Sequence, residues 1–557
     1  MARITYETRK DWQNYHLTLT NDIDDYGIFD REEEGCCAKG SPLSGPELFR
    51  ATRGPLHDYI AKAVKDRVAA GMIGRAWSFA PLAGSNRREL DLTGLQGCTR
   101  ATAADLHPDC SDAPEDVAFV RGGTTLRCLV EWAKNLSPRR SIMTSGTHLG
   151  PTVAGGFGTA SHGSRLGFGG LQDMVMGMHL ITGEKESVWI EPARAPVLSG
   201  AAASRFATRI IRSDAMFDDA LIHLGGMGIV NGVALRLAPY HSYNVLAVVH
   251  PLWPDWEAQV EQGRFREIAA QLGHDDDPAF YEVTIDPFDN DGTRDAIHLM
   301  YFIAPPGLLP PDGGDGTPLP HAGDSIAGFA KELVRRKSES EAHGLWPEGF
   351  SAFSYYKGLV REFYGAFTLP ITPASPALGW EHLHRDVVTG NAPGALYNAS
   401  YAIRRDEVGR ALPLILSAAR DLEPAFLNTI RFVTRPSGTL AFTRFEETAV
   451  IEIDGLSDNL PDALPDEVPD EARAWGVFTK TGAMKIRTEF DLNGIDYSMH
   501  WAKLGQLDAP KVERDFGPRD DPASPIGRWR ATRTALLAPE ARAVFVNDAL
   551  RTYKLVP

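Results

Sequence analysis

The sequence predicts an α+β fold of about two to four structural units. The chain has 557 residues, which exceeds the size at which a single hydrophobic core keeps growing. Short apolar segments separated by glycine pairs fill residues 71–239, as in strands joined by tight turns. A segment with helical periodicity, residues 125–135, lies between two of those strands, so helices and strands share the first unit.

The first elements along the chain follow from the spacing of apolar residues. Residues 45–70 carry Leu48, Leu56 and Ile60 on one repeating face, which predicts a long helix. Three short apolar segments that border glycine or proline predict strands: residues 117–120, 174–181 and 228–237.

The second half of the chain alternates strands with helices. Residues 404–422 predict a helix, and residues 448–453 predict a strand. Near the C-terminus, residues 483–490 predict another strand. Residues 525–537 predict a helix, because Pro525 suits a first helical turn.

The composition excludes several classes of partner. With 57 basic and 73 acidic residues the formal net charge is −16, a field that repels phosphate backbones and anionic lipid, so we expect no nucleic-acid or membrane partner. No apolar run approaches the ~20 residues that span a bilayer, and the first residues lack the apolar core of a signal peptide. The five cysteines have no metal-binding or redox spacing, so we expect mostly buried or inert thiols and a cytoplasmic location.

Residues 145–179 hold the most informative pattern of the chain. Glycines and alanines there are interleaved with threonine and serine hydroxyls. A backbone without side chains lets a ligand approach closely, and its N–H groups and hydroxyls can solvate a pyrophosphate without lysines. The pattern lacks the Gly-Lys-Ser/Thr ending of a P-loop and the helix-opening glycine triplet of a Rossmann fold. A glycine-rich turn in a tight core is the alternative interpretation.

Residues 155–164 read Gly-Gly-Phe-Gly-Thr-Ala-Ser-His-Gly-Ser and resemble the FAD-binding domain of vanillyl-alcohol oxidase (VAO/PCMH) type flavoproteins. The sugar-lactone and alditol oxidase branch carries Gly-x-x-x-Thr-x-x-His-Gly-Ser at this place. Other segments match the branch in the right order: residues 73–79 a first phosphate loop, 223–236 a strand near the adenine, and 498–503 a His-Trp-x-Lys signature. Residues 537–547 are loosely similar to its closing segment, with Ala538 in place of an aspartate.

The resemblance implies a two-subdomain FAD-binding domain from residues 1–241 and 481–557, the last segment returning to the first. An α+β cap, residues 242–480, would cover the flavin and bind substrate. The implied activity is that of an FAD-dependent oxidase acting on CH–OH donors, with hydride transfer from a substrate C–H to flavin N5. A small-molecule substrate and dioxygen, which reoxidises the flavin, are the expected partners. The small residues at 155–158 favour dioxygen over another acceptor.

The resemblance assigns cofactor contacts within the matching segments. They are Gly74, Arg75, Ala76, Trp77, Ser78, Thr147, Thr152, Val153, Gly155, Gly156, Gly158, Thr159, Ser161, His162, Gly163, Gly228, Ile229, Val230 and Lys503. Trp77 stands where the branch often has a histidine bonded to the flavin, and Gly150 where other relatives have a linking cysteine, so non-covalent FAD is expected. His148 and His162 are the alternative linkage sites. For His162 we expect a local hydrogen bond or cofactor orientation, with acid–base chemistry as the alternative.

Three residues form the expected catalytic set: Arg431, His500 and Lys503. In the alditol branch a Glu-x-Arg pair on a cap strand faces the substrate, and the corresponding place here is Thr429-Ile430-Arg431, which keeps only the arginine. Arg431, with His500, would stabilise the substrate oxygen, because a guanidinium stays cationic and donates in a planar fork. A structural salt bridge is its alternative role. Lys503 would hold a fixed cation at the flavin N1–C2=O edge, and an ordinary edge strand is the alternative there.

Other functions stay open from the sequence. An FAD-dependent dehydrogenase, and an oxidase of specialised metabolism acting on an aromatic or polycyclic compound, fit the same segments. The missing glutamate at Thr429 also allows a non-catalytic flavin-binding protein. His382 and His384 have no cluster of carboxylates or cysteines at ligand spacing, so no metal is expected.

Overall fold

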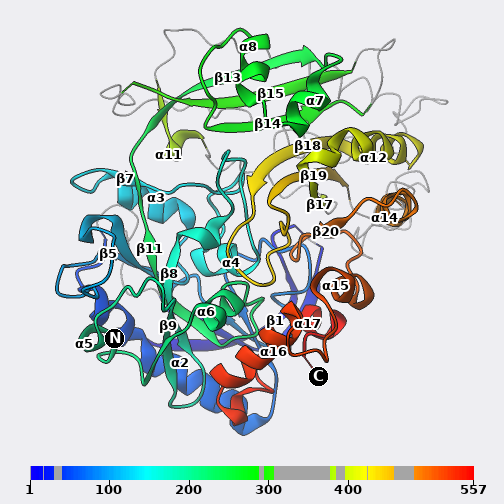
Figure 1. The fold of residues 1–557 in the computed structure, drawn as a ribbon. Coiled ribbons are helices and arrows are strands. Elements are labelled where there is room, and N and C mark those ends of the chain that lie inside the picture. The colour runs from blue at the N-terminus through cyan, green and yellow to red at the C-terminus, as the bar shows by residue number, and fades with distance from the viewer. Residues whose placement is uncertain are drawn as a thin grey trace, which may run out of the picture.

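The computed structural model describes residues 2–16, 18–30, 40–287, 294–305, 377–383, 396–422, 425–456 and 482–556. Within these residues the strands form sheets of four, six and eight strands and one two-stranded pair. Figure 1 shows the eight-stranded sheet at one end of the molecule, above the sheets and helices of the N- and C-terminal parts. Helices and strands occur together throughout, so the predicted mixed class is confirmed.

The four-stranded sheet has the order β1-β2-β4-β3 and begins the chain. Its strands are β1 (Ile4–Gln13), β2 (Thr20–Phe29), β3 (Ala70–Ile73) and β4 (Arg88–Asp91). The predicted long helix is α2 (Gly45–Asp66), which buries Leu56 and Ile60 in the core shared with these strands. The helix ends earlier than predicted because Arg67 adopts a left-handed conformation (φ 57°) that turns the chain towards β3.

The six-stranded sheet has the order β10-β9-β8-β11-β6-β5. Its strands are β5 (Cys98–Arg100), β6 (Val117–Arg121), β8 (Val175–Ile181), β9 (Ser187–Glu191), β10 (Arg209–Arg212) and β11 (Ile229–Arg236). Its helices are η1 (Pro114–Asp116), α3 (Leu126–Lys134), α4 (Val153–Gly158), η2 (Leu171–Met174), α5 (Gly200–Ala203) and α6 (Asp214–Leu221), and β7 (Arg140–Ser141) pairs with β12 (Ala238–Pro239). The predicted strands are β6, β8 and β11 and the predicted helix is α3, so all four are confirmed.

The eight-stranded sheet has the order β16-β13-β15-β14-β18-β19-β17-β20. Its strands are β13 (Ser242–Pro251), β14 (Phe280–Ile285), β15 (Asp295–Ile303), β16 (Leu378–Gly379), β17 (Leu396–Arg404), β18 (Ala425–Thr434), β19 (Glu447–Leu456) and β20 (Tyr497–Met499). Its helices are α7 (Trp256–Glu261), α8 (Phe265–Gln271), α11 (Trp380–Leu383), η3 (Arg405–Glu407) and α12 (Val408–Leu422). Strand β19 and helix α12 confirm the two elements predicted in this region.

Side chains alternate between the two faces of this sheet, as strand geometry requires. Ile430 of β18 and Ile451 of β19 lie in the hydrophobic core that also holds Ile415 of α12. Their neighbours along each strand, Arg431 and Glu452, point to the opposite face. One face of the sheet is therefore an apolar core and the other is free to be polar.

The C-terminal segment contains one wrong prediction. Residues 483–490 form helix α14 (Ala483–Leu492) instead of a strand. Its buried residues, Ala483, Ile486 and Phe490, are spaced by three and four positions, which is the period of a helix face. The predicted helix near the end is confirmed as α16 (Pro525–Leu536), and α15 (Ala509–Phe516), η5 (Pro539–Ala541) and α17 (Asp548–Thr552) complete the segment.

The end of the chain packs against its beginning. The Ala70 amide donates to the Val544 carbonyl over 2.8 Å, and Phe545 shares a core with Tyr59 of α2. Figure 1 shows α16 and α17, in red, beside the blue N-terminal elements. Strand β20 lies in the same segment but pairs with β17 of the eight-stranded sheet, so the segment contacts both parts of the molecule. The division at residues 241 and 480 stays a prediction.

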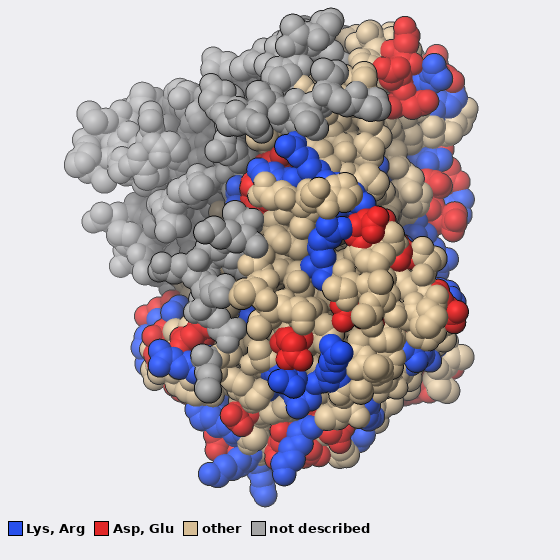
Figure 2. Space-filling model, turned by 90° about the vertical axis from the view of Figure 1, so that its left-hand side faces the viewer, with Lys and Arg blue, Asp and Glu red and all other residues tan. Residues whose placement is uncertain are grey.

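Two further features concern the cysteines and the surface. The sequence predicts mostly buried or inert thiols. Cys98 and Cys110 are free thiols and Cys98 is buried, whereas Cys128 is buried but disulfide-bonded, which its sequence spacing does not reveal. On the face shown in Figure 2, acidic and basic side chains lie intermixed among uncharged ones. Among the helices that the structure describes, none combines the length and apolar character that crossing a membrane requires.

Candidate active site

A cavity of about 300 Å³ opens between two walls of different chemistry. One wall comes from residues 72–79, from the glycine-rich segment and from the start of β11. The other comes from β17, β18 and β19 of the eight-stranded sheet and from residues 500–503. Segments that are far apart in the sequence thus meet around one space of the size that binds small molecules.

Most of the predicted cofactor residues line this cavity. They are Gly74, Arg75, Ala76, Trp77, Ser78, Thr147, Thr152, Gly155, Gly156, Thr159, Ser161, His162, Gly228, Val230 and Lys503. The three predicted catalytic residues, Arg431, His500 and Lys503, line it as well.

Four predicted cofactor residues are not among those that line the cavity, and each has a packing role instead. Val153 lies in the core of the six-stranded sheet, and Ile229 lies in the core below α2. A Cβ atom at Gly158 would lie 2.1 Å from the His223 ring, and one at Gly163 would lie 2.4 Å from the Ser145 carbonyl oxygen. These two glycines allow segments to pass closely, which the sequence pattern does not separate from ligand contact.

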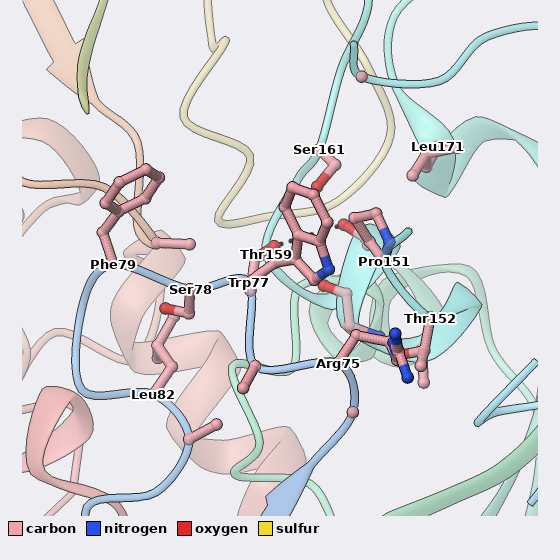
Figure 3. Close-up of a pocket in the computed structure, with 18 of the residues that line it drawn as sticks. Arg75, Trp77, Ser78, Phe79, Leu82, Pro151, Thr152, Thr159, Ser161 and Leu171 are labelled. Carbon is pink, nitrogen blue, oxygen red and sulfur yellow. Dashed lines mark hydrogen bonds between the residues drawn. The ribbon is translucent and has the colours of Figure 1, made fainter. Parts of the chain in front are cut away.

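The loop of residues 74–79 is fixed from two sides. The Phe79 amide donates to the Ala502 carbonyl over 2.8 Å, which ties the loop to the C-terminal segment. The Trp77 ring stacks on Tyr15 with 4.0 Å between centroids, and a Cβ atom at Gly150 would lie 2.6 Å from the indole. Figure 3 shows Arg75 and Trp77 around the cavity with residues of the glycine-rich segment. Trp77 and Gly150, the two positions that the sequence resemblance aligns with flavin-linking residues, therefore lie against each other.

The glycine-rich segment is held by its own hydroxyls. Thr152 caps helix α4, because its Oγ1 accepts a hydrogen bond from the Gly155 amide over 3.2 Å. The Thr159 hydroxyl donates to the Gly155 carbonyl over 2.9 Å. A Cβ atom at Gly146 would meet no atom nearer than the His162 carbonyl oxygen at 3.5 Å, so this glycine keeps the cavity open.

The opposite wall carries a cluster of buried charges. Glu452 Oε1 lies 2.6 Å from Lys503 Nζ, and Glu452 Oε2 lies 3.1 Å from Arg431 Nε. Arg431 Nη2 lies 3.5 Å from Glu282 and donates to Thr147 Oγ1 over 2.5 Å. Among the described residues, two cations and two carboxylates thus pair in this cluster, and Arg431 also contacts Thr147 of the glycine-rich wall. Arg431 therefore forms the salt bridge of the alternative interpretation and also lines the cavity.

The Lys503 ammonium is paired within the same cluster. Its ammonium donates to Ser400 Oγ over 2.8 Å as well as to Glu452. Burial opposes the ionisation of Glu452, but the charges of Arg431 and Lys503 outweigh it and hold the pKa of this carboxyl well below its usual range. Lys503 is thus a compensated cation rather than an isolated one.

Two buried histidines, His162 and His500, complete the site. Burial lowers the pKa of His162 to about 4 and lowers the pKa of His500 well below its ordinary value. Both rings are therefore neutral near pH 7. His162 Nδ1 donates to the Gly163 carbonyl over 3.0 Å, which is the local hydrogen bond expected from the sequence.

Sequence reasoning missed several residues of this wall, above all Glu452. Glu452 pairs in register with Thr429 on one side and with Ser400 on the other. Asn398 and Asp454, which bond to each other, also line the cavity. One sequence feature does indicate Glu452: it is a carboxylate in the middle of the apolar segment Val450-Ile451-Glu452-Ile453. A single charge buried in a strand requires a partner.

Metal binding has no structural support in the described residues. No group of three or more histidine, cysteine, aspartate or glutamate side chains there is arranged to hold an ion. His382 belongs to the described residues, and His384 lies outside them.

Comparison with known proteins yields a likeness of fold. No family model matches the chain, and no curated protein matches it. A histidine-to-alanine mutant of cholesterol oxidase from Brevibacterium sterolicum is similar over 100% of this chain and 98% of its own, at 12% identity and a TM-score of 0.59. A second cholesterol oxidase structure from that organism matches at 12% identity and a TM-score of 0.58, covering 99% and 97%. A solvent-stable cholesterol oxidase matches at 12% identity and 0.59, covering 99% and 98%. The chain therefore shares its overall fold with these oxidases along its whole length.

Proposed function

We propose that the chain is an FAD-dependent oxidoreductase of the vanillyl-alcohol oxidase type, nearest the sugar-lactone and alditol oxidase branch. It binds FAD non-covalently, oxidises an alcohol carbon and passes the electrons to dioxygen. One observation carries the proposal. Four segments resemble cofactor-binding segments of one family, and residues from each of them line a single cavity: 74–79, 146–162, 228–230 and 500–503.

The residues of the glycine-rich wall fit a dinucleotide. Gly146 leaves open space, and Gly74 and Gly155 bring two backbones close to Thr152 Oγ1, where Cβ atoms would lie 2.5 and 3.1 Å away. Hydroxyls and N–H groups supply hydrogen bonds without a lysine, as a buried pyrophosphate requires. Trp77 fills the space over Gly150, which supports a flavin held without a covalent bond.

The charged wall fits the substrate side of the reaction. When bound, FAD supplies the acceptor for a hydride. Arg431 and His500 would donate to the substrate oxygen. Lys503 and Arg431 would hold the Glu452 carboxylate in place, and Glu452 would accept a hydrogen bond from a hydroxyl of the substrate. This carboxylate on β19 pairs in register with Thr429 of β18, the position at which the alditol branch has a glutamate. Glu452 would therefore supply the hydrogen-bond acceptor that β18 lacks. That position argues against a flavin-binding protein without turnover.

A second candidate substrate class has its own support. The solved structures of similar fold are named cholesterol oxidases, and that likeness favours a polycyclic alcohol. The row of Asn398, Glu452 and Asp454 favours a substrate with several hydroxyls instead.

Anaerobic mixing of the purified protein with alcohols tests the proposal. The panel contains linear polyols, aromatic alcohols and sterols, and the flavin absorbance is followed. At least one alcohol should bleach the flavin, and admitting air should restore it with formation of hydrogen peroxide. Reduction without reoxidation by air would favour a dehydrogenase. A flavin that no alcohol reduces would contradict the proposal.

A further inference from the structure

The ring of His162 has one nitrogen engaged and one directed to the cavity wall. Its Nδ1 lies 3.0 Å from the Gly163 carbonyl oxygen. A carbonyl oxygen only accepts, so Nδ1 carries the proton of the neutral ring and Nε2 keeps its lone pair. Among the described residues, Nε2 makes no hydrogen bond; its near neighbour is Glu452 Oε1 at 3.8 Å.

Glu452 stands where it would stabilise a charged His162. Its carboxylate is buried and anchored by Lys503 and Arg431, so its position does not depend on His162. A fixed anion next to an imidazole favours the imidazolium that forms when the ring takes a proton. Lys503 and Arg431 oppose that proton, and burial opposes it most, which keeps the resting ring neutral.

His500 has the opposite arrangement. Its Nδ1 accepts a hydrogen bond from the Ala502 amide over 3.0 Å, so the proton of the neutral ring must be on Nε2. The two rings lie 6.1 Å apart between centroids, and Phe442 packs against both. Both residues line the cavity. At Nε2, His162 therefore has a lone pair, and His500 has an N–H donor.

We infer that His162 is the general base of the reaction and takes the alcohol proton at Nε2, with Glu452 as its charge partner. The inference rests on the proposed function. The substrate C–H bond would break with its electron pair leaving as hydride, for which bound FAD would supply the acceptor. The O–H bond breaks, its proton moves to His162 Nε2, and the carbonyl forms. Departure of hydride makes the O–H group strongly acidic, so a base of low proton affinity suffices.

The first test reads the tautomer without any turnover. Histidine labelled with ¹⁵N in the holoenzyme, with His162→Asn used for assignment, should show His162 protonated at Nδ1 and bare at Nε2 at pH 7. A proton on Nε2, or on both nitrogens, would overturn the inference.

The second test uses two variants in the anaerobic half-reaction. Asparagine at this position can keep the donor to Gly163 while it removes Nε2, so His162→Asn should keep the flavin spectrum. Its flavin reduction by an alcohol that bleaches the wild type should slow by about 100-fold or more. His162→Gly should be partly restored by added imidazole, which a structural role would not produce. His241→Gln, a change outside the cavity lining, is the control and should reduce at the wild-type rate.

The outcomes separate the two proposals. Unchanged reduction in His162→Asn, with a normal wild type, would overturn the role of His162 and leave the proposed function standing. A wild type that no alcohol reduces would overturn the proposed function and this inference with it.

Discussion

The two walls of the cavity are built on opposite principles. The glycine-rich wall presents backbone and small side chains, and its hydroxyls, such as Thr152 and Thr159, bond within their own segment. The wall from the eight-stranded sheet presents long charged side chains, Arg431, Glu452 and Lys503, which bond across strands. The first wall lets a ligand approach the backbone closely, and the second holds buried charged side chains.

The difference also explains how each wall is encoded. Much of the glycine-rich wall comes from residues 146–162, which are continuous in sequence, so composition alone indicates that part. The charged wall joins residues from 398 to 503 that meet only through strand register, as in the pairing of Thr429 with Glu452 and of Glu452 with Ser400. A shift of register by one residue would turn each of these side chains to the other face of the sheet.

The largest effect is expected from removing one charge of the second wall. Glu452→Gln removes the carboxylate that pairs with both Arg431 and Lys503, so the folded protein should lose about 3–5 kcal/mol. The midpoint of thermal unfolding measures the loss.

The matched control for that change restores the charge balance. The double variant Glu452→Gln/Lys503→Met should recover about half of the loss, because an unpaired buried cation is gone. A single variant as stable as the wild type would show that the cluster is hydrated rather than buried.

A smaller effect is expected from filling the first wall. Gly146→Leu places a side chain in open space, so the fold should persist while FAD binds about 10- to 100-fold more weakly. Gly54→Leu, on the exposed part of α2 where a Cβ meets no atom within 4 Å, is the control. Flavin titration by fluorescence measures both affinities. Equal affinities would place the cofactor elsewhere.

Mild acid should lower the free energy of unfolding, because several buried histidines are neutral in the folded protein. Burial lowers the pKa of His162 and His223 to about 4, and that of His179 and His298 to about 3. The unfolded chain binds these protons near pH 6.5, so stability is lost as the pH falls from 6.5 towards 4. Each such group contributes about 1.4 kcal/mol per pH unit in that window. Thermal midpoints at pH 7, 6 and 5 measure the loss, and a flat profile would contradict neutral burial.

Much of the fold followed from local patterns, and the exceptions have physical reasons. Helices α2, α3 and α12 and strands β6, β8 and β11 were predictable from their apolar spacing and their glycine or proline borders, and helix α16 from the proline at its start. Helix α14 was mistaken for a strand because its alternation of polar and apolar residues over 483–490 imitates a strand.

The candidate site was predictable only in part. Residues 74–78 and most of the predicted residues of the glycine-rich segment line the cavity, and motifs mark both, although Gly158 and Gly163 serve packing. Their contacts with a cofactor stay predictions. Glu452 was not found, because its role depends on which strand lies beside β18. Asn398 was not predicted as a site residue, because its contact with Asp454 likewise requires the register of β17 and β19.

The central claim, a flavin held without a covalent bond between these two walls, has a direct measurement. The visible absorption spectrum of the purified protein is recorded, then repeated on the supernatant after acid precipitation. We expect a flavin spectrum that moves into the supernatant and is identified there as FAD. Flavin that stays in the pellet would contradict the non-covalent assignment and point to His148 or His162 as the linkage. A colourless protein that FAD does not reconstitute would contradict the account as a whole.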